Sequence, residues 1–221
     1  MLKAVIFDLD GTLTSSDLEL AKKIVSEELA ALTGESYEDT RRKMEHIHYQ
    51  FNVQSVYDRN IWWEQFSPDI SLEEKQRLTN LYWKLIVETT YVREYAEELL
   101  SALKEKGLIL VLLTDYDGES FSKRERVRSL SITGYFDLVV IAGDDTEKTK
   151  PFSEPYIHIL ETLKMNPDEI LMVGDKPEVD LVGADALGMK TLLLKGDYGD
   201  EWEHVEKDLV GVSRFIEELL A

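Results

Sequence analysis

Five short apolar runs that do not alternate with polar residues dominate the hydrophobic pattern of the chain. They lie at Ala4–Phe7, Leu108–Leu113, Leu138–Ala142, Ile170–Val173 and Thr191–Leu194. Runs of this kind are typical of strands that are covered on both faces, as in a parallel sheet. The pattern therefore predicts a buried sheet built mainly from these five segments.

Amphipathic segments separate the apolar runs and predict helices. The expected helices are Arg93–Lys106, Glu154–Leu163, Val179–Leu187 and Ser213–Leu220. Gly107 and Gly188 are positioned to end the first and the third of them. Because strands and helices alternate, we expect an α/β fold with an open, parallel, Rossmann-like sheet flanked by helices.

The stretch between the first and second apolar runs breaks this alternation. Leu20, Ile24, Leu29 and Leu32 form an apolar stripe that ends before a glycine at position 34, and Ser71 with Glu74 forms a capping-box pattern. A helical stretch of about 75 residues is far longer than a crossover between strands needs. We expect a catalytic core at residues 1–15 and 92–221 and an inserted all-α cap domain at residues 16–91.

Composition and charge exclude several classes of function. The chain has 25 Lys+Arg against 44 Asp+Glu, a net charge of −19, which disfavours nucleic acid and membrane surfaces as partners. It has no cysteine, which excludes disulfides, thiolate metal sites and cysteine nucleophiles. No apolar run approaches the roughly 18 residues of a membrane span. The start, MLKAVIFDLDG, lacks a signal-peptide pattern, so we expect a cytoplasmic protein.

Polar residues follow the apolar runs at the positions where strands are expected to end. Asp8 and Asp10 follow the first run, Thr114 follows the second, Lys150 precedes a helix, and Asp175 follows the fourth run. The carboxyl ends of parallel strands meet at one edge of a sheet, where ligands bind. We therefore expect these side chains to converge.

Such a convergence of carboxylates requires a compensating cation. Two carboxylates about 4 Å apart repel each other by roughly 4 kcal/mol at an effective dielectric near 20. Mg²⁺ suits a site with few carboxylates, phosphate and water, whereas zinc favours histidine and thiolate ligands that these motifs lack. Asp8, Asp10 and Asp175 are therefore candidate ligands of Mg²⁺.

Taken together, these motifs resemble the haloacid dehalogenase superfamily, in particular its phosphatases with a helical cap inserted after the first motif. The resemblance lies in DLDGT at residues 8–12, Thr114 after a hydrophobic strand, Lys150-Pro151, and Gly174-Asp175 with Asp180 five positions on. It covers residues 1–15 and about 92–221. It covers the cap only in its placement and helicity.

The resemblance implies a role for each residue that would contact the phosphoryl group. Asp8 would be the nucleophile that forms an aspartyl-phosphate, and Asp10 the general acid and then the general base. Thr114 would donate a hydrogen bond to a phosphoryl oxygen. Lys150 would hold Asp8 and the phosphoryl group.

The metal site and the turn of the first motif follow from the same resemblance. Asp8, Asp175 and the main-chain carbonyl of Asp10 would bind Mg²⁺, and Asp180 would lie behind them in the second shell of ligands. Gly11 suits a tight turn in which the main chain approaches the bound group.

Each assignment has a structural alternative. An aspartate at the end of a strand often caps the next helix, and Thr114 could be a core hydroxyl. Lys148 competes with Lys150, although the pairing with proline favours Lys150. Asp180 could simply occupy the first turn of its helix.

Asp115 departs from the family pattern, in which a small or amide residue often follows the threonine, and Asp117 adds a second carboxylate nearby. A carboxylate pointing inward there would repel phosphate. We expect Asp115 to face away from the phosphoryl group, or to contact a hydroxyl or amine of the substrate, while its main-chain N–H serves the phosphate.

Within the cap, the sequence indicates an aromatic and cationic cluster. Its members are His46, His48, Tyr49, Arg59, Trp62 and Trp63. They could line a pocket, but aromatics of this kind more often form the core of their own domain. The two histidines are two positions apart, which makes a poor metal pair on a helix. The basic run at residues 123–126 is interpreted as a solvated helix face.

These observations favour a Mg²⁺-dependent phosphomonoester hydrolase of a small soluble phosphorylated metabolite, with no nucleic acid or membrane partner. A phosphosugar mutase of the same superfamily would retain every motif. A 2-haloacid dehalogenase would not need Asp10 as an acid, and a non-catalytic binding module should have lost a reacting residue. Nothing in the sequence selects a substrate or an oligomeric state.

Overall fold

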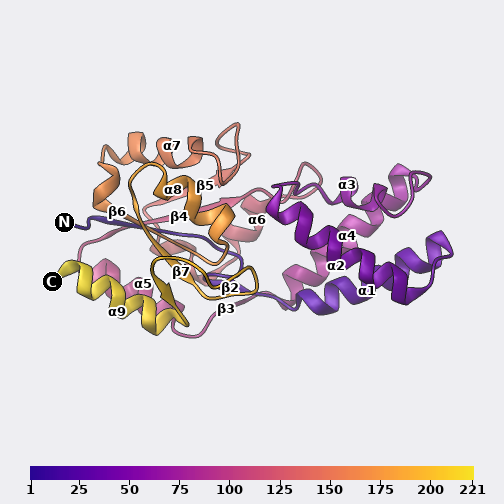
Figure 1. The fold of residues 1–221 in the computed structure, drawn as a ribbon, viewed down its shortest axis with the longest axis horizontal. Helices are drawn as coiled ribbons and strands as arrows, with labels where there is room; N and C mark the ends of the chain where they lie inside the picture. The colour runs from indigo at the N-terminus through magenta and orange to yellow at the C-terminus, as the bar shows by residue number, and fades with distance from the viewer. The chain divides into compact units, whose positions relative to one another are not determined.

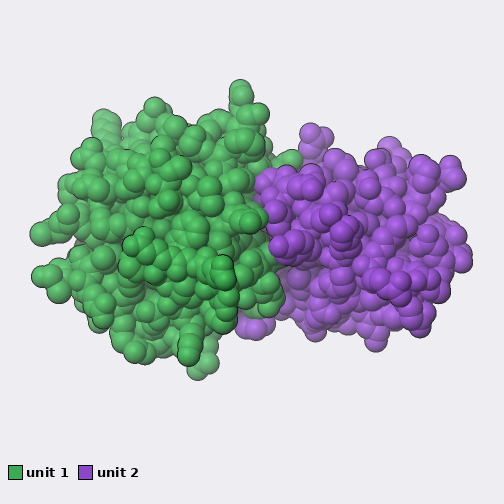
Figure 2. Space-filling model, in the orientation of Figure 1, with its two compact units in different colours: residues 1–15, 92–116, 127–221 green, residues 16–91, 117–126 purple.

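The computed structural model describes residues 1–221, which divide into two compact units (Figure 2). Unit 1 comprises Met1–Ser15, Val92–Tyr116 and Val127–Ala221, and unit 2 comprises Ser16–Tyr91 and Asp117–Arg126. The sequence analysis left residues 117–126 with the core segments, whereas in the structure they fold with the helices of unit 2. The chain therefore leaves and re-enters unit 1 twice.

Unit 1 contains a six-stranded sheet in which all neighbouring strands are parallel, in the order β5-β4-β1-β6-β7-β8 (Figure 1). This arrangement confirms the predicted α/β fold, and each of the five predicted runs coincides with a strand. The two-residue strand β8 was not expected. The strands are β1 Ala4–Phe7, β4 Ile109–Asp115, β5 Leu138–Ala142, β6 Ile170–Gly174, β7 Lys190–Leu194 and β8 Val205–Glu206.

Helices cover both faces of the sheet, which explains why its central strands consist mostly of apolar residues. Alternate residues of each strand enter two separate core layers; Leu110 and Leu112 of β4 face one layer, and Val111 and Leu113 face the other. The first layer lies under α5 and α9, and the second under α7 and α8 (Figure 1). The helices are α5 Ala96–Glu105, α7 Glu154–Leu163, α8 Val182–Asp185 and α9 Leu209–Leu220.

Three of these helices differ from the sequence prediction in their bounds. Helix α5 begins later than expected because Tyr95 adopts a left-handed conformation, with φ 68°. Helix α9 begins before Ser213 because Asp208 caps it by accepting the N–H of Gly211. The predicted helix 179–187 is a π-helical turn, Pro177–Leu181, followed by the short α8. Two 3₁₀ turns, Ser131–Tyr135 and Pro167–Glu169, complete unit 1.

Unit 2 is helical, as its sequence pattern predicts. Gly34 ends α1 in a left-handed conformation, and the Ser71 hydroxyl caps α4 by accepting the N–H of Glu74. The helices are α1 Leu18–Thr33, α2 Tyr37–Val53, α3 Arg59–Glu64, α4 Leu72–Thr89 and α6 Lys123–Arg128, the last ending within unit 1. The linker strands β2 Thr14–Ser15 and β3 Tyr91–Val92 pair with each other.

An aromatic core holds the helices of unit 2 together. Trp62 and Trp63 of α3 are fully buried and pack against Tyr82 of α4. The indole N–H of Trp63 donates to the hydroxyl of Thr79 at 2.8 Å, and that hydroxyl donates to Asn60 at 2.6 Å. These two tryptophans therefore form the interior of unit 2.

The segment 117–126 joins unit 2 through specific contacts. Ser120 accepts a hydrogen bond from the Asn60 side chain at 2.9 Å, and the ring of Phe121 stacks on Trp83. Asp117 pairs with Lys123 and Arg126, each at 2.9 Å. Because Lys123 and Arg126 are buried in these contacts, the interpretation of residues 123–126 as a solvated helix face was wrong for both of them.

No helix of the structure combines the length and the apolar composition that a membrane crossing requires.

Candidate active site

Asp8 follows strand β1, which lies between β4 and β6 in the middle of the sheet. The chain fills one side of β1 with β4 and β5 before crossing to β6 on the other side. Phe7 is level with Leu112 of β4 and with Val173 of β6, so the three strands end at the same edge. Such a switch point in strand order is where open α/β sheets bind ligands.

Lys150 connects the carboxylates at this edge. Its ammonium donates to Oδ1 of Asp8 at 2.6 Å and to Oδ1 of Asp180 at 2.7 Å, and the whole side chain is buried. The other oxygen of Asp8, Oδ2, is also buried and has no hydrogen-bond partner within the protein. One side of the Asp8 carboxylate is thus fixed by a cation, while the other is left for a group that binds from outside.

Asp180 organises the loop after β6 through both of its oxygens. While Oδ1 contacts Lys150, Oδ2 accepts the main-chain N–H groups of Asp175 at 3.1 Å and Lys176 at 2.9 Å. The hydroxyl of Tyr156 on α7 donates to the main-chain carbonyl of Asp180 at 2.7 Å. Asp180 is therefore held in place and in turn orients Asp175.

The DLDGT segment forms a tight turn beside Asp175. The N–H groups of Leu13 and Thr14 both donate to the carbonyl of Leu9, and Gly11 adopts φ +96°. The Thr12 hydroxyl approaches Oδ1 of Asp175 at 3.5 Å. Asp10 lies in this turn and its main chain bridges to Thr14, so the turn carries Asp10 at the edge of the sheet.

Thr114 and Asp115 are the last two residues of β4. The Thr114 side chain is buried at the end of this strand. The Asp115 carboxylate is turned toward Lys150: its Oδ1 accepts the main-chain N–H of Lys150 at 2.9 Å, and its Oδ2 lies 3.8 Å from the Lys150 ammonium. Lys150 thus contacts three carboxylates of unit 1.

The electrostatics of the site follow from its burial. Burial raises the pKa of Asp8, an effect that nearby Lys150 opposes, and burial raises the pKa of Asp175 to about 8. Burial alone would lower the pKa of Lys150, but Asp180, Asp8 and Asp115 hold it well above its ordinary value. Lys150 is therefore fixed as a cation among these carboxylates.

A divalent cation fits this donor set. Carboxylate oxygens of Asp8, Asp175 and Asp180 lie within 4.8 Å of one another, and all three residues are buried. A cation would give the Asp8 Oδ2 atom the partner that it lacks and would favour the ionised form of Asp175, whose pKa burial raises to about 8. The sequence hypothesis named Asp10 rather than Asp180 as the third ligand, through its main-chain carbonyl. Both of the Asp180 oxygens are already used by Lys150 and by main-chain N–H groups.

Sequence reasoning missed two residues that lie beside the site. Lys176 follows Asp175 directly and holds its ammonium 4.9 Å from the centre of the Tyr198 ring. Arg93, just after the helical segment, donates to the carbonyl of Gly11 at 2.6 Å. Neither residue belongs to a motif, although the position of Lys176 beside Asp175 was a usable signal.

The candidate cluster of unit 2 does not form one site. Trp62 and Trp63 are core residues, and the Arg59 guanidinium is buried against the ring of Trp62 at 3.6 Å. His48 is buried beside Asn52, whereas Tyr49 is 56% exposed.

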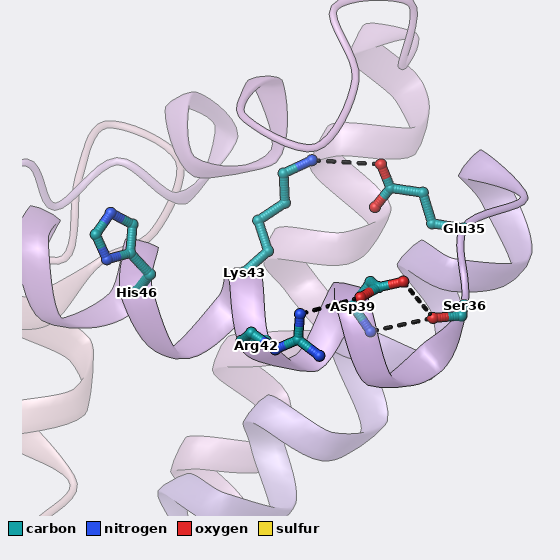
Figure 3. A pocket seen from close by; sticks show the side chains of 6 residues that line it. All are labelled: Glu35, Ser36, Asp39, Arg42, Lys43 and His46. Atoms are coloured by element: carbon teal, nitrogen blue, oxygen red, sulfur yellow. Dashed lines mark hydrogen bonds and ion pairs between the residues drawn. The ribbon is translucent and has the colours of Figure 1, made fainter.

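His46 instead lines an open surface depression of about 620 Å³ on unit 2 (Figure 3). Most of the charged groups in this depression pair with one another: Lys43 with Glu35, and Asp39 with both Ser36 and Arg42 (Figure 3). Its lining residues are Glu35, Ser36, Asp39, Arg42, Lys43 and His46.

The chain matches a known family of proteins. Residues 2–188 match the family described as haloacid dehalogenase-like hydrolase. The chain is 29% identical over 206 residues to a putative pyrophosphatase PpaX of Caldanaerobacter subterraneus, covering 88% of this chain and 82% of the relative. It is 31% identical over 216 residues to a phosphoglycolate phosphatase of Nitrosospira multiformis, covering 94% and 89%.

A solved structure shares the fold over nearly the whole length. A HAD phosphatase from Thermococcus onnurineus superimposes with a TM-score of 0.74 at 24% sequence identity, covering 97% of this chain and 98% of that one. The chain belongs to the haloacid dehalogenase-like hydrolases and is one of the phosphatases of that family.

Proposed function

We propose that the protein is a Mg²⁺-dependent phosphomonoester hydrolase that acts through a phosphorylated Asp8. The observation that carries this proposal is the asymmetry of the Asp8 carboxylate, in which Lys150 holds Oδ1 at 2.6 Å while Oδ2 is buried without a partner. Buried polar atoms rarely lack a partner, and exceptions often mark a site where another group binds.

In the first half of the proposed reaction, a carboxylate oxygen of Asp8 attacks phosphorus. The bond between phosphorus and the leaving oxygen breaks, and Asp10 donates a proton to that oxygen. The Thr114 hydroxyl, the main-chain N–H of Asp115 and the Lys150 ammonium bind the phosphoryl oxygens. In the second half, Asp10 takes a proton from water, whose oxygen attacks phosphorus to release inorganic phosphate and restore Asp8.

Asp8, Asp175 and the main-chain carbonyl of Asp10 would hold the Mg²⁺ ion, with Asp180 and Lys150 behind them. The ion supplies positive charge that favours the ionised carboxylates and neutralises the phosphoryl oxygens. The paired oxygens of Asp180 support its role as a residue that positions Asp175.

The substrate is proposed to be a small phosphorylated metabolite. The relatives are named for pyrophosphate and phosphoglycolate, both small anions that carry the phosphoryl group to be removed. Unit 2 is proposed to act as the cap, which sets the selectivity for the rest of the substrate.

The test is release of inorganic phosphate from p-nitrophenyl phosphate, pyrophosphate, phosphoglycolate and hexose phosphates, with Mg²⁺ and with EDTA. We expect release that requires Mg²⁺ and is abolished in Asp8→Asn. Asp69→Asn, at an exposed position of unit 2, is the matched control that should keep full activity. Absence of Mg²⁺-dependent release from every compound between pH 5 and 9 would reject the proposal, and formation of hexose phosphate isomers in place of free phosphate would indicate a mutase.

A further inference from the structure

Asp115 contacts both ends of Lys150. Its Oδ1 accepts the main-chain N–H of Lys150 at 2.9 Å, and its Oδ2 lies 3.8 Å from the ammonium at the tip of the same residue. Asp115 is 8% exposed and Lys150 is 1% exposed, so both contacts are shielded from bulk water. The sequence motifs did not predict a contact between Asp115 and Lys150.

The two residues come from different kinds of structure in unit 1. Asp115 ends β4, where it is level with Ala142 of the neighbouring strand. Its side chain is in phase with Val111 and Leu113, which enter the core layer under α7 and α8. Lys150 lies in the irregular stretch between β5 and α7, outside any strand or helix. The strand residue is thus able to fix the loop residue.

The Lys150 ammonium has to be held in place because of its contacts with two carboxylates. It must stay within hydrogen-bond distance of the Asp8 oxygen, which it contacts at 2.6 Å, and of the Asp180 oxygen at 2.7 Å. A shift of about 1 Å in such a group can cost on the order of a hundredfold in rate. An ionised acceptor makes a stronger hydrogen bond to a main-chain N–H than a neutral one does.

We propose that Asp115 is a positioning residue that holds Lys150 against Asp8, and that its carboxylate does not bind the substrate. This proposal rests on the proposed function, because it assigns a purpose to the placement of Lys150. It also explains how a carboxylate is tolerated next to the phosphate-binding Thr114. Both oxygens of the Asp115 carboxylate lie near Lys150, one beside its main-chain N–H and the other beside its ammonium.

The test compares Asp115→Ala with Asp115→Asn. The asparagine keeps an oxygen that can accept the Lys150 N–H, whereas alanine removes the acceptor. On p-nitrophenyl phosphate with Mg²⁺ we expect Asp115→Ala to lower kcat by about tenfold or more with a smaller change in KM, and Asp115→Asn to recover most of that loss. Asp144→Ala, at an exposed position after β5, is the control for removing an aspartate nearby.

A second measurement detects the hydrogen bond between the Lys150 N–H and Asp115 independently of enzyme activity. In ¹H–¹⁵N spectra of the wild-type protein, the Lys150 amide proton should resonate downfield and exchange slowly with solvent. Both properties should be lost in Asp115→Ala and kept in Asp115→Asn. A rapidly exchanging Lys150 amide in the wild type would overturn the proposal even if the alanine variant failed to fold.

The outcomes separate this inference from the proposed function. If the wild type releases no phosphate, the proposed function fails, while the Lys150 amide still decides whether Asp115 holds the loop. If the wild type is active and Asp115→Ala matches it in kcat, the positioning role is rejected. A change confined to KM that differs between substrates, with the Lys150 amide unaltered, would instead show that Asp115 contacts the substrate.

Discussion

The main chain of Gly11 lies directly against the carboxylate of Asp175, so that a β-carbon placed on Gly11 would lie 2.3 Å from Asp175 Oδ2. The DLDGT turn and the loop after β6 are thus in contact through a residue that has no side chain. Gly11 also adopts φ +96°, which residues with a side chain rarely adopt. Both observations require glycine at this position.

Replacing Gly11 with alanine is therefore expected to damage both stability and activity. The new methyl group would displace Asp175, in addition to straining the backbone, and the free energy of unfolding should fall by about 2 kcal/mol or more. Gly107→Ala is the matched control, because Gly107 also has a positive φ but has open space around it. Urea unfolding of both variants checks the prediction, which fails if the two lose the same stability.

Lys150→Met should remove nearly all phosphatase activity, because it leaves the buried Asp8 and Asp180 carboxylates without their shared cation. Breaking a buried ion pair from one side costs roughly 3–5 kcal/mol, so a loss of stability should accompany the loss of kcat. Lys148→Met is the control on the same loop, since the Lys148 ammonium packs 5.8 Å from the centre of the Phe152 ring. Equal kcat values for the two variants would contradict the assignment of Lys150.

Mg²⁺ binding should release protons below pH 8. The pKa of Asp175 is raised to about 8 by burial in the metal-free protein, and a cation binds the ionised form, so binding must displace that proton. Affinity for Mg²⁺ should consequently rise with pH up to about 8 and then level off. Isothermal titration calorimetry in buffers of different ionisation enthalpy measures the released protons, and an affinity independent of pH between 5 and 8 would contradict the prediction.

The same group should make the metal-free protein less stable as the pH rises. The pKa of Asp175 is 3.8 in its ordinary state and about 8 in the folded protein, so the folded state holds the proton longer than the unfolded state does. Its contribution to the free energy of unfolding therefore falls from about pH 4 to about pH 8. Asp175→Asn should remove this decline and raise the stability of the metal-free protein at pH 9 by roughly 1–2 kcal/mol.

Thermal unfolding with and without Mg²⁺ checks this prediction. Mg²⁺ should stabilise the wild type and leave Asp175→Asn almost unchanged, because the variant lacks a ligand. A variant that is less stable than the wild type at pH 9 in EDTA would show that Asp175 is not an uncompensated charge.

Thr79→Val should weaken unit 2, because it removes the hydroxyl that accepts from Trp63 and donates to Asn60. The Trp63 indole N–H donates to the Thr79 hydroxyl at 2.8 Å, and valine would leave that N–H buried without a partner, at a cost of about 1–3 kcal/mol. Thr162→Val, at an exposed position of α7, is the control. Denaturant unfolding monitored by tryptophan fluorescence should show the loss in the first variant only.

Local pattern predicted the strands because each is covered on both faces and so consists of consecutive apolar residues. The run Leu138–Ala142 and the helix Glu154–Leu163 were predicted with the bounds that the structure gives. Asp8 and Asp175 could be named as candidates because each directly follows a strand of the sheet, whereas Asp180 was named from its spacing in the family motif. Thr114 was likewise named from the end of its strand, and Lys150 from its pairing with Pro151.

What the sequence did not predict depends on contacts between distant residues. Lys123 and Arg126 have the composition of an exposed helix face, yet Asp117 binds both in the interior. Asp115 contacts Lys150 across 35 positions of the chain, and no local pattern indicates which way a carboxylate at a strand end will turn. The π-helical turn at 177–181 retains the apolar spacing of a helix and so could not be distinguished from one.

Unit 2 consists of two stretches of chain, which limits how the protein can be truncated or its units exchanged. Excising residues 16–91 would remove Trp83 and Asn60, the partners of Phe121 and Ser120, and would expose a segment that begins three residues after Thr114. Any attempt to exchange the helices of unit 2 between relatives must carry residues 117–126 with them.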